Sequence, residues 1–289
     1  MLLANLIKKS FNQIITNSNM LFYLVLFLIL LTVLSGFTFS ANNAISGIIY
    51  YFCTLFLITS FFSGWGYLIK EIASKEEEKI EYVKTFLEGV GKNTISLTIG
   101  VIFLFIIMNL VMYLSNYIAL KYFGDISFIQ KDLTVISQDP QTIKNYILNL
   151  SQDKIITIYG WALCGAISLF FYGFLVLFYL PSLIYNEKNN FFTKPFVALI
   201  NSLIFVFKNF KHTILIYLGV LALYIFLLFA NTTTMQNPIL SFIVLFIYIY
   251  FISFVIMLIF NYYEQRYNSS NGNDSIGQDK CLDTTSEEN

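Results

Sequence analysis

The residues of this chain that could carry acid–base or metal chemistry are few, and they are most concentrated in one short stretch. That stretch is KEEEKIE, from Lys75 to Glu81, and the single histidine of the chain is His212. Paired carboxylates beside a histidine act as general acids and bases, or bind a metal ion, when folding brings them together. A run of mixed charge is more typical of a solvated surface. A lipid-acting enzyme would need Glu78, Glu81 and His212 to converge.

The sequence also has none of the common motifs of enzymes or metal sites. The chain has no nucleotide-binding loop, no Gly-x-Ser-x-Gly elbow and no His-Glu-x-x-His motif. Its cysteines, Cys53, Cys164 and Cys281, have a spacing that fits neither a zinc site nor a disulfide framework. A formal net charge of zero gives no support for nucleic-acid binding. We therefore predict a protein that is not an enzyme, with no catalytic, cofactor-binding or metal-binding residues and no cofactor.

Long uncharged tracts dominate the sequence, which is 57% hydrophobic and 12% charged. A helix needs about 20 apolar residues to cross a hydrocarbon layer about 30 Å thick. Six spans are predicted near Met20–Phe39, Ile45–Ile69, Ile95–Ile118, Ile155–Leu180, Thr213–Ala230 and Pro238–Phe260. Because the tracts are continuously apolar and do not alternate, they favour helices over barrel strands. The predicted fold class is an all-α polytopic membrane helix bundle.

The lysines and arginines predict how these spans cross the membrane, because basic loops favour the cytoplasmic side. Basic residues lie before the first span, between the second and third, between the fourth and fifth, and after the sixth. The short links Ser40–Gly47 and Asn231–Pro238 carry none, so each should join a hairpin. We expect a multi-pass protein of the cell membrane with both termini in the cytoplasm, and a first span that is not cleaved as a signal peptide.

A similar sequence pattern occurs three times: an amphipathic stretch, then a hinge residue, then a predicted span. The three copies align without gaps: Ser10, Thr85 and Ser202 correspond, and the hinge residues seven positions later are Asn17, Lys92 and Asn209. Residues 1–262 are thus predicted to form three repeat units, about 1–70, 76–181 and 191–262. Each unit would be an interfacial amphipathic helix followed by a transmembrane hairpin. The alternative is coincidence, since amphipathic helices commonly precede spans.

Small and polar residues within the spans predict how the helices pack, because small side chains allow close approach. We expect the faces Gly160–Cys164–Ser168, Ser60–Gly64 and Ser96–Gly100 to point into the bundle. Asn109 should form a hydrogen bond between helices. Trp65, in the helix-breaking stretch SGWG, fits an aromatic belt at the membrane surface.

Two segments lie outside the predicted bundle. Residues 119–154 form the non-cytoplasmic linker, and Asp139–Leu150 has the pattern of a short amphipathic helix that begins at Asp139 and Pro140. That helix would rest on the outer surface, or alternatively act as a gate. Residues 263–289 are polar and acidic, and they predict a disordered cytoplasmic tail.

The pattern Ser-Phe-x5-Asn followed by a span, as in Ser10–Asn17, resembles uncharacterised six-span membrane-protein families of bacteria and archaea. These include the membrane domain attached to some glycerophosphodiester phosphodiesterases. The resemblance covers most of residues 1–262 and implies a prokaryotic membrane protein. It does not imply phosphodiesterase activity, because this sequence has no counterpart of the catalytic barrel.

Two hypotheses of function remain beside the lipid-acting enzyme. The first is a non-enzymatic scaffold of the cell envelope, whose partners are membrane lipids or a protein at the cytoplasmic face. The second is the permease subunit of a transporter or exporter with a separate ATPase chain. In that case the linkers Lys70–Asn93 and Asn186–Lys211 would dock the ATPase.

Overall fold

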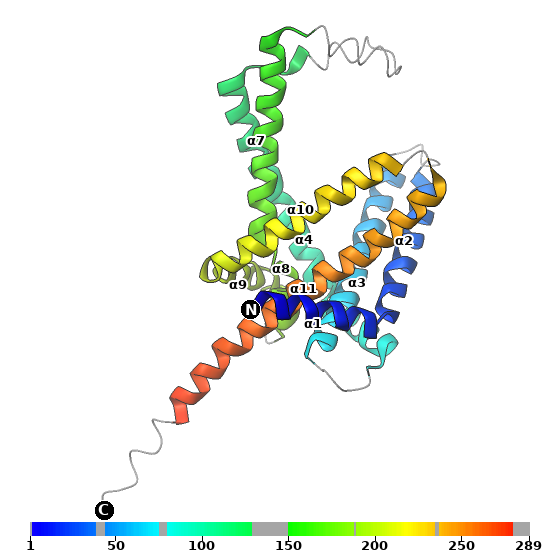
Figure 1. Ribbon diagram of the computed structural model, residues 1–289, viewed down its shortest axis with the longest axis vertical. Helices are drawn as coiled ribbons and strands as arrows, with labels where there is room; N and C mark the ends of the chain where they lie inside the picture. The colour runs from blue at the N-terminus through cyan, green and yellow to red at the C-terminus, as the bar shows by residue number, and fades with distance from the viewer. Residues whose placement is uncertain are drawn as a thin grey trace, which may run out of the picture. The chain divides into compact units, whose positions relative to one another are not determined.

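The computed structural model describes residues 2–38, 44–74, 80–128, 150–187, 189–234 and 237–279, and this part of the chain is helical without any strand. Its helices are α1 (Leu2–Thr16), α2 (Asn19–Thr38), α3 (Ala44–Ser74), α4 (Tyr82–Phe123), α7 (Gln152–Val176), α8 (Tyr179–Tyr185), α9 (Lys194–Lys208), α10 (Phe210–Thr234) and α11 (Pro238–Asp279) (Figure 1). Six stretches are long and apolar enough to cross a membrane. The prediction of an all-α, six-span membrane protein is confirmed.

Asparagine ends the amphipathic helix in the first and third copies. Helix α1 stops at Thr16, and the side-chain amide of Asn17 donates to the carbonyl of Gln13 at 2.9 Å. Helix α9 stops at Lys208, and Asn209 donates in the same way to the carbonyl of Phe205 at 3.1 Å. An asparagine side chain competes with the backbone for such carbonyls, which explains the end of both helices at the predicted hinge.

The second copy has no such break, and here the structure differs from the expectation. Helix α4 runs through Lys92 as one 42-residue helix, about 63 Å long at about 1.5 Å per residue. Lysine is a good helix former, and the ammonium of Lys92 donates to Glu88 and Tyr67 and to no carbonyl of the preceding turn among the described residues. The residues on both sides of Lys92 are also packed, since Gly89, Ser96 and Gly100 are all buried. The amphipathic stretch and the third span are therefore continuous.

The fourth predicted span, Ile155–Leu180, is divided into α7 and α8. Pro181 explains the break after Val176, because proline has no backbone N–H and its ring clashes with the carbonyl four residues earlier. The chain also divides near this point into two compact units. Unit 1 contains the described residues up to Val101 together with those from Leu177 onward, and unit 2 contains those from Ile102 to Val176.

The core of unit 1 lies where the ends of α3, α8 and α11 pack against one another. Its largest fully buried side chains include Trp65, Phe178, Phe260 and Tyr262. Gly66 marks the meeting point, since a Cβ at this residue would lie 2.4 Å from Cδ1 of Ile184 and 3.5 Å from Cζ of Phe260. Trp65 is 0% exposed and stacks on Phe61, so the expectation of a membrane-surface belt is wrong, and SGWG does not break α3.

The amphipathic stretch of each copy packs on one of these three core helices. Helix α1 lies across α11, where the amide of Asn261 donates to Ser10 Oγ at 2.9 Å (Figure 1). The start of α4 packs on α3, where Ser63 Oγ donates to the carbonyl of Gly89 at 2.9 Å. Helix α9 packs on α8. The order is cyclic: each amphipathic stretch contacts the last helix of the preceding hairpin, and the first contacts that of the third. A true triplication stays a prediction.

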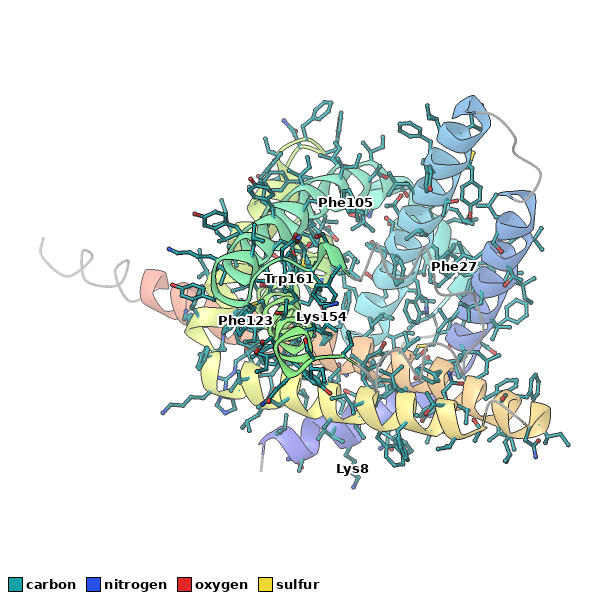
Figure 2. The ribbon with its side chains drawn as sticks, turned by 90° about the horizontal axis from the view of Figure 1, so that it is seen from above. Lys8, Phe27, Phe105, Phe123, Lys154 and Trp161 are labelled. Atoms are coloured by element: carbon teal, nitrogen blue, oxygen red, sulfur yellow. The ribbon has the colours of Figure 1, made fainter. Side chains whose placement is uncertain are left out.

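Unit 2 is a pair of helices, the second half of α4 and α7. Trp161 Nε1 donates to the carbonyl of Gly124 at 2.9 Å, and Thr157 Oγ1 donates to that of Phe123 at 2.8 Å. Figure 2 shows Phe123, Lys154 and Trp161 together at this end. Gly124 has a φ of +87°, which favours glycine and ends α4. The short helix predicted at Asp139–Leu150 lies outside the described residues.

The small-residue faces point inward as predicted at their glycines. A Cβ at Gly64 would lie 2.8 Å from the carbonyl oxygen of Phe86, at Gly100 1.7 Å from the hydroxyl of Tyr179, and at Gly160 2.2 Å from the ring of Phe123. Cys164 is only half-buried and Cys53 is exposed; both are free thiols.

Two further expectations differ from the structure. Asn109 donates to the carbonyl of Phe105 on its own helix at 2.8 Å, and no described residue of another helix bonds to it. Because a carbonyl of its own helix accepts this hydrogen bond, the amide of Asn109 does not need an acceptor on a neighbouring helix. Helix α11 continues to Asp279 and so enters the segment from residue 263 that was expected to be disordered. Once a helix has formed, each added residue costs little, so helix α11 extends beyond the span into polar sequence.

Candidate functional site

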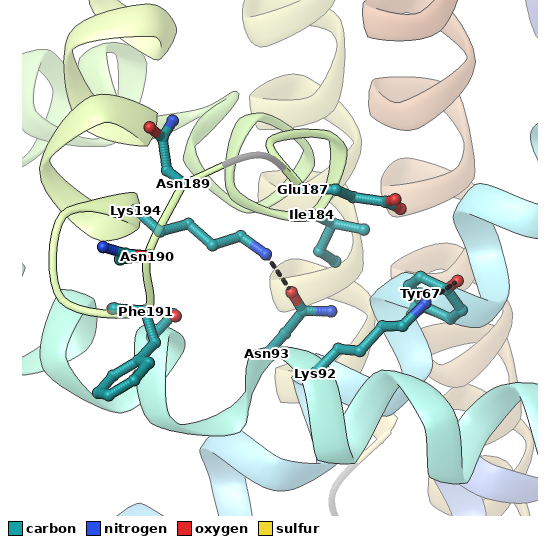
Figure 3. Close-up of a pocket in the computed structure, with 10 residues that line it drawn as sticks. Tyr67, Lys92, Asn93, Ile184, Glu187, Asn189, Asn190, Phe191 and Lys194 are labelled. Atoms are coloured by element: carbon teal, nitrogen blue, oxygen red, sulfur yellow. Dashed lines mark hydrogen bonds between the residues drawn. The ribbon is translucent and has the colours of Figure 1, made fainter.

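A polar pocket of about 390 Å³ lies in unit 1, between α3, α4 and the connection from α8 to α9 (Figure 3). It is lined by Tyr67, Lys92, Asn93, Ser96, Ile184, Glu187, Asn189, Asn190, Phe191 and Lys194. Most of these residues belong to the two linkers that were considered as an ATPase-docking surface. The structure brings those linkers together, since Lys194 Nζ donates to Oδ1 of Asn93 at 2.6 Å, and just beyond the first linker Ser96 Oγ donates to the carbonyl of Phe191 at 3.0 Å.

Lys194 is the central charged group of the pocket. Its ammonium donates to Oδ1 of Asn93 at 2.6 Å, and the residue is only 6% exposed (Figure 3). Lys194 begins α9, and Pro195 directly after it fits the first helical turn. The helix start therefore fixes where the Lys194 side chain leaves the backbone, and the hydrogen bond to Asn93 gives the direction of its ammonium. Lysine is almost never this buried without an ionic partner, because desolvating the ammonium costs free energy.

Lys92, which lines the pocket, and Lys70, which does not, are both held around Tyr67. Lys92 donates to Glu88 Oε1 at 2.6 Å and to the hydroxyl of Tyr67 at 3.1 Å. Glu88 and Lys92 lie four residues apart on α4, the spacing that brings side chains together on a helix. Lys70 pairs with Glu187, and both lysine ammoniums lie 5.1–5.3 Å from the centre of the Tyr67 ring.

The charges of the site do not cancel. Among the residues that line the pocket, two lysines (Lys92 and Lys194) against one glutamate (Glu187) leave one net positive charge. Burial lowers the pKa of Lys194 below its ordinary value; Glu187 opposes this shift, and the charges of Lys70 and Lys92 add to it. The hydrogen bond from Lys70 lowers the pKa of Glu187. The arrangement favours binding of an anion.

Of the residues considered for catalysis, Glu81 and His212 are described, and no contact joins them. Glu81 lies at the exposed start of α4 and pairs with Lys84 at 3.5 Å, whereas His212 is exposed in the first turn of α10. Glu78 lies outside the described residues. Among the described residues no group of three or more His, Cys, Asp or Glu side chains could hold a metal ion. No observation therefore favours the lipid-acting enzyme.

Sequence reasoning missed the pocket, because it used the lysines only to orient the spans. One signal was present. Pro195 is typical of the first turn of a helix, so the backbone of Lys194 beside it is predicted to be held by that helix and not to belong to a loop. Asn93 gave no signal, since its role depends on a residue 101 positions away.

No protein-family model matches the chain, and no curated protein and no solved structure matches it. The resemblance to six-span families stays an expectation, and the function has to be inferred from the geometry of the site itself.

Proposed function

We propose that this integral membrane protein is a non-enzymatic binding protein of the prokaryotic cell membrane, whose ligand is a membrane lipid held at the cytoplasmic face. Six apolar helices place the chain in a membrane. The observation that carries the proposal is the positively charged pocket around Lys194, in a segment that the lysine distribution assigns to the cytoplasmic side. Anionic lipids of that leaflet attract basic groups near the membrane surface.

The short amphipathic helices α1 and α9, of which α9 begins at the pocket, support a position at the headgroups. Helix α1 buries Leu6 and Ile14 but exposes Ile7, Phe11 and Ile15. Helix α9 likewise exposes large apolar residues, namely Phe196, Ile200, Ile204 and Phe207. Exposed apolar faces on helices that flank the spans are typical of helices lying in the membrane interface. They would hold the pocket within reach of lipid headgroups.

The second candidate is the permease subunit of a transporter with a separate ATPase chain. One observation favours it: the two linkers meet at the pocket, where Lys194 Nζ donates to Oδ1 of Asn93. A separate ATPase chain would need a docking surface, and linkers that meet can supply one. A nucleotide-binding chain that copurifies at fixed stoichiometry, and whose ATP hydrolysis depends on this protein, would establish this alternative.

The lipid-binding proposal is tested by purifying the full chain in a mild detergent and identifying the retained lipids by mass spectrometry. We expect anionic phospholipid to be retained at a fixed ratio and enriched over its share of the host membrane. As a control, the Lys84→Gln variant should retain the same lipid at the same ratio, because Lys84 is exposed on the surface of α4 and does not line the pocket. A chain that is repeatedly isolated as a lipid-free monomer would contradict the proposal.

A further inference from the structure

We propose that the pocket of unit 1 binds a phosphate group, with the ammonium of Lys194 and the side-chain amide of Asn93 as its donors and Lys92 at its edge. The inference rests on the proposed lipid-binding function and names the chemical group that the site recognises. A phosphate can come from a lipid headgroup or from a soluble phosphate compound, and both share this chemistry.

Lys194 has donors to spare. An ammonium carries three N–H groups. In the described part of the chain, its one hydrogen-bond partner is Oδ1 of Asn93. Buried donors are nearly always satisfied by protein, water or ligand. Because Lys194 is 6% exposed, its remaining donors call for an acceptor inside the pocket.

Asn93 supplies a donor whose direction is determined by Lys194. An ammonium can only donate, so the amide oxygen of Asn93 has to face it and the amide nitrogen has to face the other way. Figure 3 shows this nitrogen on the side of Asn93 away from Lys194, between the two lysines. Asn93 is 2% exposed, and no described residue accepts a hydrogen bond from Nδ2. Two buried, adjacent side chains therefore present unused donors to the same space.

The geometry favours a phosphate over a planar carboxylate. Planar groups are matched by the fork of an arginine, whereas lysine binds phosphate as a point charge. Here the donors come from two helices, with Lys194 on α9 and Lys92 and Asn93 on α4. Donors from separate directions suit the tetrahedral oxygens of a phosphate. The net positive charge of the site adds to the attraction, and the volume of about 390 Å³ leaves room for a headgroup.

Glu187 sets a limit on this affinity. Its carboxylate pairs with Lys70 at the pocket and is half exposed, so it is an internal anion that repels an incoming phosphate. Removing its charge should raise the affinity of the site for phosphate. This gain cannot be produced by a variant that merely unfolds.

The test is titration calorimetry on the detergent-solubilised full chain. One arm uses inorganic phosphate, and the other uses a short-chain phosphatidic acid, with the matching phosphatidylcholine as a reference. Three variants are compared: Lys194→Gln, Glu187→Gln and, as a matched control on the same helix α9, Lys208→Gln, whose side chain is exposed. We expect Lys194→Gln to lose at least about tenfold in affinity, as for a lost hydrogen bond to a charged group.

Glu187→Gln should bind more tightly than the wild type, and Lys208→Gln should match it. Binding of inorganic phosphate in the first arm would support a site for the phosphate group alone, and binding confined to the second arm would support a lipid headgroup. Equal affinities of Lys194→Gln and Lys208→Gln, or weaker binding by Glu187→Gln, would overturn the inference. If lipid is retained but Lys194→Gln changes nothing, the lipid-binding function stands and the phosphate site falls. If inorganic phosphate binds but no lipid is retained, the phosphate site stands and the lipid-binding function falls.

Discussion

The amphipathic stretches of the first and third copies are separate helices, whereas that of the second copy is the beginning of a longer one. At Asn17 and Asn209 the side-chain amide donates a hydrogen bond to a carbonyl of the last helical turn, and the helix ends. At Lys92 the helix continues, and the next residue, Asn93, enters the pocket. The candidate site therefore lies where the repeated pattern departs from its other two copies.

The two kinds of copy also differ in how they pack. Four residues after the aligned Ser10 and Ser202, the first and third copies bury a large apolar side chain, Ile14 or Val206. The second copy has Gly89 at this position, and its backbone approaches α3 closely. Side-chain packing holds α1 and α9 to their neighbours, while backbone proximity holds α4 to α3. That proximity places Lys92 beside Tyr67.

The largest effect is expected when this close approach is blocked. In Gly89→Ala the new Cβ would lie 2.4 Å from Cβ of Tyr67 and 2.9 Å from the carbonyl oxygen of Ser63. Neither atom is the end of a flexible side chain, so α3 and α4 have to separate, at a cost of about 1–3 kcal/mol. Thermal unfolding in detergent should show a lower melting temperature.

Gly91→Ala is the matched control, since nothing lies within 4 Å of a Cβ at this position of the same helix. Alanine there should stabilise the protein by about 0.5–1 kcal/mol, because it replaces glycine inside a helix. If both variants shifted the melting temperature in the same direction, the contrast between backbone and side-chain packing would be wrong.

A smaller effect separates the two asparagine hinges. Asn17 has two roles: its amide nitrogen donates to Gln13, and its Oδ1 accepts a hydrogen bond from the hydroxyl of Tyr82 at 2.7 Å. Asn209 shows only the local bond among the described residues. Asn17→Ala should therefore be less stable than Asn209→Ala by about 1 kcal/mol, the net value of one hydrogen bond.

Chemical denaturation in detergent would measure this difference. The double variant Asn17→Ala/Tyr82→Phe serves as the control, because Tyr82→Phe should add little once the acceptor is gone. Additive losses would show that the Asn17–Tyr82 bond contributes nothing to the difference.

The sequence was sufficient for the features that depend on neighbours along the chain. Span length follows from apolar tract length, and the ends of α1 and α9 follow from the local competition of Asn17 and Asn209 for backbone carbonyls. The continuity of α4 was not predictable in this way, because it depends on packing at Gly89 and Gly100 against residues of α3 and α8.

The same limit explains the errors at Trp65 and at the pocket. A tryptophan near the end of a span can face the membrane surface or a protein core, and only the convergence of α3, α8 and α11 puts Trp65 inside. The pocket needs Lys194 and Asn93, which are 101 residues apart, to meet. A single sequence reports the period of apolar residues, but it does not report which helix faces will contact each other.

The smallest expected effect decides between the two explanations of the continuous helix. If packing on both sides of position 92 holds α4 straight, Lys92→Asn should leave it unbroken, because asparagine costs a helix only about 0.5 kcal/mol relative to lysine. Spin labels at Val83 and Ile99, in a background without the native cysteines, should then stay about 24 Å apart at about 1.5 Å per residue. A clear shortening of the Val83–Ile99 distance in Lys92→Asn would instead mean that the hinge residue alone selects between a broken and a continuous helix, and that the pocket depends on this one lysine.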